Sequence, residues 1–134
     1  MRFLLDTDTA SFIIKGRSPA IRKTLQTISP DDIAISAVTA AELRYGLKRL
    51  PPEHRLHMLV AEFLKTIVVL PWTDSAAVWY AEIRHQLTAS GQPIGELDMM
   101  IAAHALDVGA TLVTNNLRHY ERIKAPLRFC SWAD

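Results

Sequence analysis

The sequence predicts an α/β fold in which helices cover both faces of a central parallel sheet. Short runs rich in isoleucine, valine and leucine alternate along the chain with longer segments of helical period. The short runs are apolar at consecutive positions, which is typical of parallel strands that are buried on both faces. The 134 residues have the size of one ordinary domain, so we expect a single domain over residues 1–134.

Four of the apolar runs are predicted strands, and a fifth is weaker. In chain order they are Phe3–Leu5, Ile33–Ser36, Ile67–Leu70 and Thr111–Val113, with the weaker run at Leu127–Cys130. In an open parallel sheet the functional crevice lies at the carboxyl ends of the strands, near a switch in strand order. The first strand runs directly into Asp6, which we therefore expect at that edge.

Five segments with helical period lie between these strands. They are Pro19–Ile28, Val38–Leu50, Pro52–Thr66, Ser75–Ala89 and Glu96–Val108. Pro19 and Pro52 stand at predicted first helical positions, where the missing amide hydrogen is tolerated, and a glycine follows each of the last two segments. Ser36 or Thr39 is available as the N-cap of the second segment.

Composition excludes several classes of protein. Hydrophobic residues make up 49% of the chain and charged residues 22%, which is the balance of a globular protein. No apolar stretch approaches the roughly 20 residues that span a bilayer, and Asp6 leaves no room for the apolar part of a signal peptide. We therefore expect a cytoplasmic protein without a membrane anchor. Cys130 is the single cysteine, so the chain cannot form an internal disulfide. The net charge of +1 argues neither for nor against a polyanionic partner.

Glu42 is the first acid in an unexpected place. In the helix VTAAELRYGLKRL it falls on the predicted inward stripe with Val38, Ala41 and Tyr45. The basic residues of this helix lie on its other side. Asp98 repeats the pattern in GELDMMIAAHALDVG, where it is in register with the apolar face near the positive end of the helix dipole. Two helices thus each turn one carboxylate inward.

Taken singly, each of these acids has an ordinary explanation. Asp98 can be a first-turn acid that the dipole favours, Glu42 can pair with an arginine, and Asp6 can cap the next helix. Taken together, converging carboxylates repel one another and lose hydration, so that they bind protons or a cation. Oxygen ligands favour a hard cation, Mg²⁺ or Mn²⁺, over zinc or copper.

The fourth predicted strand adds polar groups at the same edge. In TLVTNN it leaves its apolar run at Thr114 and delivers Asn115 and Asn116 beside Asp6. Asparagine is also common in strand-to-helix turns, and the two roles are compatible. The histidines suggest no further metal site: His54 and His57 lack a third ligand and are predicted on a solvated face, and His104 is a surface or packed residue.

Four segments together resemble the PIN-domain ribonucleases, and within them the VapC-type toxins of bacterial toxin–antitoxin pairs. They are LLDTDT, ISAVTAAELRYGL, PIGELDMMIAAHAL and GATLVTNNLRHYERI, in this order. Their order and spacing cover nearly the whole chain and make the match specific. The resemblance implies a PIN-like three-layer α/β/α sandwich with a central parallel sheet of four to five strands.

The resemblance also implies which residues form the site. Asp6, Glu42 and Asp98 would be the metal-binding acids and, with Asn116, the catalytic residues. Asn116 stands where many relatives carry a further aspartate. A supporting role falls to Thr114, Asp8 and Glu96. Asp8 stands at a position where relatives often have asparagine. It would be a helix cap or a residue that contacts the metal ligands without binding the ion.

The implied activity is Mg²⁺-dependent cleavage of RNA, with Mn²⁺ as an alternative ion and a metal-activated water as nucleophile. Members of this family often cut tRNA, some of them initiator tRNA, and thereby stop translation and growth. They are generally homodimers and are held inactive by a VapB-type antitoxin, a segment of which enters the active-site groove. Residues 52–64 and the apolar sides of the early helices are the partner surfaces that we expect.

Basic residues near the predicted acids are candidates for holding the RNA backbone. They are Arg44, Lys48, Arg49, Arg17 and Arg118, with Lys15, Arg22 and Lys23 close by in the sequence. In such an interface phosphate contacts position the RNA, and other features specify it. An ordinary solvated set of basic side chains explains these residues equally well.

Two other functions stay open at this stage. Asp6 and Asp8 after a strand also match the first motif of haloacid-dehalogenase-like phosphatases, although the chain is short for that family and Glu42 and Asp98 would have no role. The second alternative is a non-catalytic PIN-like module that only binds RNA or a partner. Purified protein of this kind would show no Mg²⁺-dependent cleavage of RNA.

Overall fold

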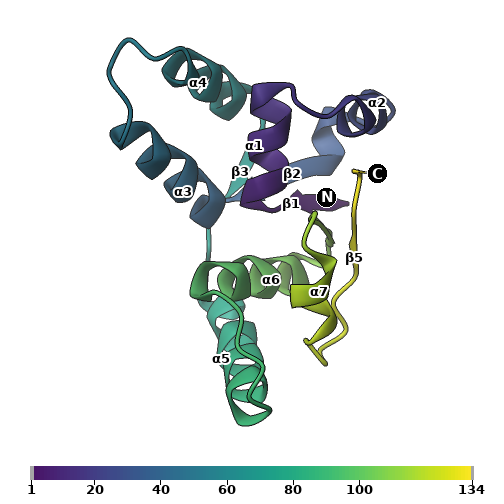
Figure 1. The fold of residues 1–134 in the computed structure, drawn as a ribbon. Coiled ribbons are helices and arrows are strands. Elements are labelled where there is room, and N and C mark those ends of the chain that lie inside the picture. Colours follow the sequence, from purple (N-terminus) through teal and green to yellow (C-terminus); the bar gives the residue numbers. More distant parts are fainter. Residues whose placement is uncertain (1, 134) are drawn as a thin grey trace.

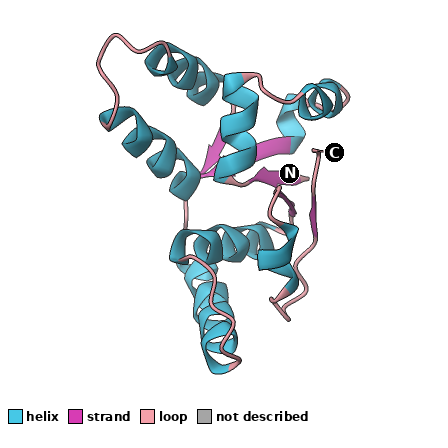
Figure 2. Cartoon of the chain, in the orientation of Figure 1, coloured by secondary structure: helices cyan, strands magenta, loops and turns pink. Residues whose placement is uncertain are grey.

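The computed structural model describes residues 2–133 and contains one five-stranded sheet (Figure 1 and Figure 2). The strands are β1 (Phe3–Leu5), β2 (Ile33–Ser36), β3 (Val68–Leu70), β4 (Thr111–Val113) and β5 (Phe129–Cys130). All neighbouring strands are parallel, and their spatial order is β3-β2-β1-β4-β5. The predicted fold class is confirmed, including the weak fifth strand.

Seven helices and one 3₁₀ turn connect these strands within residues 2–133. They are α1 (Thr7–Lys15), α2 (Pro19–Gln26), the 3₁₀ turn Pro30–Asp32, α3 (Ala37–Lys48), α4 (Leu56–Thr66), α5 (Asp74–Ala89), α6 (Glu96–Val108) and α7 (Leu117–Glu121). The five predicted helices are all present. Pro52 is wrong as a helix start, because residues 51–55 form a turn before Leu56. Helices α1 and α7 were not predicted from the sequence.

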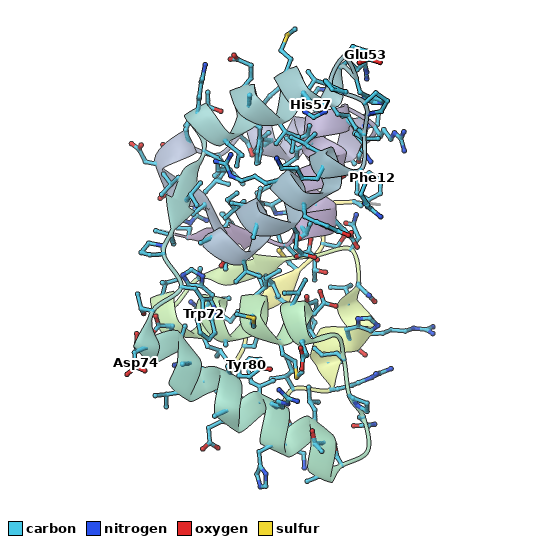
Figure 3. The ribbon with its side chains drawn as sticks, turned by 90° about the vertical axis from the view of Figure 1, so that its left-hand side faces the viewer. Phe12, Glu53, His57, Trp72, Asp74 and Tyr80 are labelled. Atoms are coloured by element: carbon cyan, nitrogen blue, oxygen red, sulfur yellow. The ribbon has the colours of Figure 1, made fainter. Side chains whose placement is uncertain are left out.

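The helices form two layers, one on each face of the sheet. Figure 1 shows α1, α2 and α4 on one side and α5, α6 and α7 on the other. Figure 3 shows the same layers from the side, with His57 of α4 near one end of the molecule and Tyr80 of α5 near the other. Leu4 packs with the α5 and α6 layer, and its neighbour Leu5 packs with the α1 and α2 layer. Because successive strand residues enter different cores, every position of the strand has to be apolar.

The order of the strands reverses at β1. From β1 the chain moves outward through β2 to β3, and it then returns to the other side of β1 to add β4 and β5. Leu5 is paired with Ile35 and with Val113, so the residues that follow these three strands lie at one edge. This edge is the switch point at which open α/β sheets bind their ligands.

Within residues 2–133, none of the helices has the length and apolar character that crossing a bilayer requires.

Candidate active site

Asp6 lies in the floor of the switch point. Its backbone amide donates to Val113 O across 2.9 Å, which continues the pairing of β1 with β4. The side chain is 4% exposed and is the N-cap of α1, because Oδ1 accepts from the amide of Thr9 at 2.8 Å. The cap explains why a strand can end on a carboxylate here. It also fixes where that carboxylate points.

Glu42 enters the site from the second turn of α3. Its carboxylate is half-buried and accepts a short hydrogen bond from the hydroxyl of Thr7, the first residue of α1. Thr7 Oγ1 also lies 3.3 Å from Thr39 Oγ1, one turn before Glu42. A residue that sequence reasoning did not single out thus connects Glu42 to the helix that Asp6 caps.

Asp98 reaches the site from the first turn of α6. Its side chain is 38% exposed, and its Oδ2 lies 3.5 Å from Nδ1 of His119 on α7. Asn116 precedes α7, and its Nδ2 lies within hydrogen-bond distance, 2.9 Å, of the same ring nitrogen. The backbone amide of Asn116 donates to Thr114 Oγ1 at 2.9 Å. Asn116 and Asp98 therefore share His119 as a neighbour, and the sequence signal for His119 is only its three-residue spacing from Asn116.

A buried hydrogen bond links the two helices that carry Glu42 and Asp98. Ser36 Oγ accepts from the amide of Val38 at 3.1 Å and so caps α3, as one of the two predicted N-caps. The same oxygen lies 2.7 Å from Nδ1 of His104 on α6, and both residues are at most 1% exposed. His104 is thus the packed residue of the two predicted alternatives. Its bond to the α3 cap fixes the start of one acid-bearing helix against the other.

The acids influence one another electrostatically. Burial raises the pKa of Asp6, and the nearby Asp8 adds to this, while the hydroxyl of Thr114 and the amide of Thr9 oppose it. Burial also raises the pKa of Glu42. The Thr7 hydrogen bond lowers it, and the charges of Asp98, Asp8 and Asp6 raise it further. The charges of Asp6 and Asp98 thus both act on Glu42, so the three predicted acids lie near one another.

The donor set fits a hard divalent cation that keeps part of its water shell. Within residues 2–133, no three His, Cys, Asp or Glu side chains are close enough together to enclose one ion. Mg²⁺ typically binds through one or two carboxylates with water and substrate phosphate as the remaining ligands, so it does not need such a cage. Asp6, Glu42 and Asp98 would supply the oxygen donors, and a bound cation would offset the charges of Asp6 and Asp98 that act on Glu42.

The predicted supporting residues Asp8 and Glu96 lie on different helices, and the predicted basic residues are found on the surface. Asp8 is exposed in the first turn of α1, and Glu96 forms an ion pair with Arg84 of α5 at 3.3 Å. The predicted basic residues are all exposed. They are Arg17, Arg44, Lys48, Arg49 and Arg118. Arg49 and Lys15 line one groove with Thr7, Asp8 and Glu42.

Two predictions about side-chain environment are wrong. Ala41 and Tyr45 were predicted to face the core with Glu42, but both are exposed, Tyr45 at 65%. They line a hollow between α3 and α6 beside the acids, because the inward face of α3 is instead formed by Val38, Thr39 and Ala40. His57 was predicted on a solvated face, but its Nε2 is buried without a hydrogen-bond partner in the described part of the chain.

Without a divalent cation, Asp6→Asn is expected to stabilise the protein, and more so as the pH rises. Because the pKa of Asp6 is raised in the folded state, its contribution to the free energy of unfolding is fully present below the ordinary aspartate pKa. It is lost as the pH rises through the folded pKa. Asparagine keeps the cap of α1 without this loss. We expect a gain of about 1 kcal/mol at pH 8, shrinking toward pH 4, in urea denaturation with EDTA.

Asp74→Asn is the matched control, because Asp74 is an exposed first-turn acid of α5. Its effect on stability should not follow this pH dependence. Added Mg²⁺ should stabilise the wild type more than the Asp6→Asn protein, because the ion binds the folded state alone. A stabilisation that grows toward acid pH would contradict the prediction.

Carboxylates at the switch point of a five-stranded parallel sheet are the arrangement that the resemblance to PIN-domain nucleases predicts. The model of the PIN domain family matches residues 3–125, and the chain belongs to this family. It is 39% identical over 133 residues to the tRNA(fMet)-specific endonuclease VapC of Salmonella typhimurium, covering 98% of both chains. It is 33% identical to ribonuclease VapC2 of Haemophilus influenzae, again over 98% of both. Within the PIN family the chain is a VapC-type ribonuclease toxin.

Solved structures agree with this assignment. The DNA-bound VapBC structure from Salmonella typhimurium superposes with a TM-score of 0.91 at 36% identity, covering 99% of both chains. VapBC2 from Rickettsia felis, bound to a promoter DNA fragment, gives a TM-score of 0.89 at 29% identity and covers 98% of this chain and 99% of the other. The family assignment decides against the haloacid-dehalogenase-like alternative.

Proposed function

We propose that this protein is a Mg²⁺-dependent endoribonuclease that cleaves tRNA, with initiator tRNA as its first candidate substrate, and that a VapB-type antitoxin neutralises it. In this proposal one PIN domain over residues 1–134 acts in the cytoplasm as a homodimer and stops translation and growth. The observation that carries the proposal is the position of Asp6 at the switch point, with Glu42 bonded to Thr7 of the helix that Asp6 caps and with the charges of Asp6 and Asp98 acting on Glu42. Similarity over nearly the full length to a relative named tRNA(fMet)-specific endonuclease supports the substrate.

The residues of the site divide the work. Asp6 and Asp98 would hold Mg²⁺, or Mn²⁺ in its place, and Glu42 would complete the negative charge while Thr7 keeps its carboxylate in place. The bound ion would lower the pKa of a water molecule and stabilise charge on the leaving oxygen. Asn116 adds no negative charge. The side-chain amide of Asn116 holds His119 beside Asp98. Asn116 therefore contributes to the geometry of the site and not to its negative charge.

The basic rim supports an RNA substrate. Lys15 and Arg49 lie in the same groove as Glu42, and Arg44 and Lys48 continue the positive charge along α3. Phosphate groups held at this rim would place the backbone over the acids, which by themselves repel it. Arg17, after α1, and Arg118, on α7, are exposed and are further candidates for phosphate contacts.

The groove between α1, α3 and α4 is the surface that we assign to the antitoxin. Its apolar side chains are Ile14, Leu43, Leu47, Leu50, Leu56 and Val60. Thr7, Asp8 and Glu42 form its polar end at the acidic site. A segment with an apolar face and a terminal cation would fill this groove and neutralise the acids at once. The predicted partner surface, residues 52–64, contributes Leu56 and Val60.

The proposal is tested with purified protein that is free of antitoxin. Initiator tRNA should be cut at one position in Mg²⁺, elongator methionine tRNA should stay intact, and EDTA should abolish the cleavage. Sequencing of the 5′ ends produced in cells should return the same position. Intact initiator tRNA after incubation with folded, Mg²⁺-loaded protein would contradict the substrate, and no Mg²⁺-dependent cleavage of any RNA would favour a non-catalytic module.

A further inference from the structure

The hollow between α3 and α6 contains an aromatic side chain that does not pack in either core. Tyr45 is 65% exposed and belongs to neither of the two hydrophobic cores within residues 2–133. The hollow has a volume of about 670 Å³, which is within the range of pockets that bind small ligands. Leu97 and Met100 of α6 also line it, and so does Glu42. Because Leu97 directly precedes Asp98, the hollow lies next to two of the three acids.

Arg49 lies against the ring of Tyr45. Its guanidinium carbon is 5.5 Å from the ring centroid, which is within the range of a cation–π interaction. Arg49 also lines the groove between α1, α3 and α4, and Thr7 and Glu42 likewise line both the groove and the hollow. The two spaces therefore adjoin at Glu42, and one cation is shared between them.

Another tyrosine–arginine pair of the same spacing has an ordinary structural role. Tyr80 and Arg84 are also four residues apart on a helix, with the guanidinium carbon 6.0 Å from the ring centroid. Tyr80, however, is half-buried, packs edge-on against Trp72, and accepts a hydrogen bond from Arg84 through its hydroxyl. Tyr45 instead leaves most of its surface exposed beside an acid of the site. Packing within the chain thus accounts for Tyr80 but not for Tyr45.

A ligand that suits this arrangement carries a flat ring joined to a negative charge. The ring would stack on Tyr45, and the negative charge would pair with Arg49. An RNA nucleotide has both features, because its base is linked to a phosphate, and proteins commonly bind unpaired bases by stacking them on aromatic side chains. A base inside a duplex is covered on both faces by its neighbours, so it offers no free face to the tyrosine.

We propose that Tyr45 and Arg49 form a binding subsite for an unpaired RNA base next to the phosphate that is cut. The inference rests on the proposed function, in which RNA is the substrate and the acids are the centre of cleavage. It adds a requirement on the substrate: the strand is unpaired on the side of the cut that enters the hollow.

The test measures RNA binding by fluorescence anisotropy at low salt in EDTA, so that no RNA is cut. The probes are a dye-labelled, unstructured RNA strand and the same strand annealed to its complement. Tyr45→Leu should bind the single strand roughly tenfold more weakly than the wild type does, because the stacking partner is lost. It should bind the duplex like the wild type. Tyr45→Phe should bind both probes like the wild type, because it keeps the ring.

Phe12→Leu is the matched control. Phe12 is an exposed aromatic residue of α1 (Figure 3), and it lines neither the hollow nor the groove. Its replacement should leave the binding of both probes unchanged. The oligomeric state of every variant is measured by analytical ultracentrifugation, and we expect it to be that of the wild type.

The outcomes separate this inference from the proposed function. A Tyr45→Leu protein that binds the single strand as tightly as the wild type, or that loses affinity equally for both probes, overturns the inference alone. A change of oligomeric state in Tyr45→Leu assigns the hollow to a second copy of this chain and also overturns it. A wild-type protein that binds the single strand through Tyr45 but cuts no RNA in Mg²⁺ supports the inference and overturns the endonuclease function.

Discussion

Replacing Asp98 with asparagine is expected to reduce cleavage of RNA by at least roughly 10²–10³-fold, the loss typical of removing one charge-stabilising group. The substitution keeps the size of the side chain but removes the charge that would hold the cation. Asp98 is more than one third exposed and contacts His119 only at 3.5 Å, so its loss leaves the core intact. Cleavage would be measured on purified protein with end-labelled tRNA in Mg²⁺.

Cells that express the same variant should continue to grow. Induced wild type should stop growth and generate new RNA 5′ ends, whereas Asp98→Asn and Asp6→Asn should do neither. Asp107→Asn is the matched control, because Asp107 lies on the same helix at its other end. It should act like the wild type. Variants at Asp6 and Asp98 that stop growth and produce the wild-type ends would refute the assignment of the acids.

The second large effect is expected in the groove between α1, α3 and α4. The double substitution Ile14→Gln and Leu47→Gln should weaken antitoxin binding by roughly 10²-fold, because each removes an apolar anchor worth about 1–2 kcal/mol. Both side chains are only partly buried, so glutamine is tolerated in the free toxin. Neither substitution changes the charge near the acids. Binding would be measured by calorimetry with the antitoxin.

Growth provides the second measurement for this prediction. Cells that express the double variant should stay arrested when the antitoxin is produced, whereas the wild type should be rescued. Met58→Gln with Val78→Gln is the control, because both residues are exposed apolar side chains outside the groove. Equal affinity of the groove variant and the wild type would place the antitoxin on another surface.

Sequence reasoning found the acids because each broke a local pattern. Asp6 ended an apolar strand and Asp98 interrupted an apolar register, so the need for a buried strand or stripe made these exceptions visible. Glu42 was singled out from a predicted stripe that the structure does not keep, because Ala41 and Tyr45 are exposed. The central strand β1 was predictable for the same reason, since its successive residues Leu4 and Leu5 enter two different cores. Where a carboxylate is out of place in an apolar pattern, one sequence is enough to find it.

The rest of the site could not be found in this way, because its members fit their local patterns. His119 is an ordinary helical residue until the structure places its ring nitrogen 3.5 Å from Asp98. Thr7 is a normal first-turn residue whose bond to Glu42 spans 35 positions. Helix α7, at five residues, is too short for a periodic signal, and α1 begins directly at the acidic motif. Such partners are set by tertiary contacts.

The pairing of β1 with β4 determines when, during synthesis of the chain, the active site can form. Phe3 pairs with Thr111 and Leu5 with Val113, and Asp6 donates its amide to Val113. While β4 is still inside the ribosome, Asp6 and Glu42 are already synthesised, but the pairing of β1 with β4 that holds Asp6 in place has not formed. Pairings this distant in sequence close late in folding. Nuclease activity is therefore expected only after residues 111–113 have left the ribosome and paired with β1.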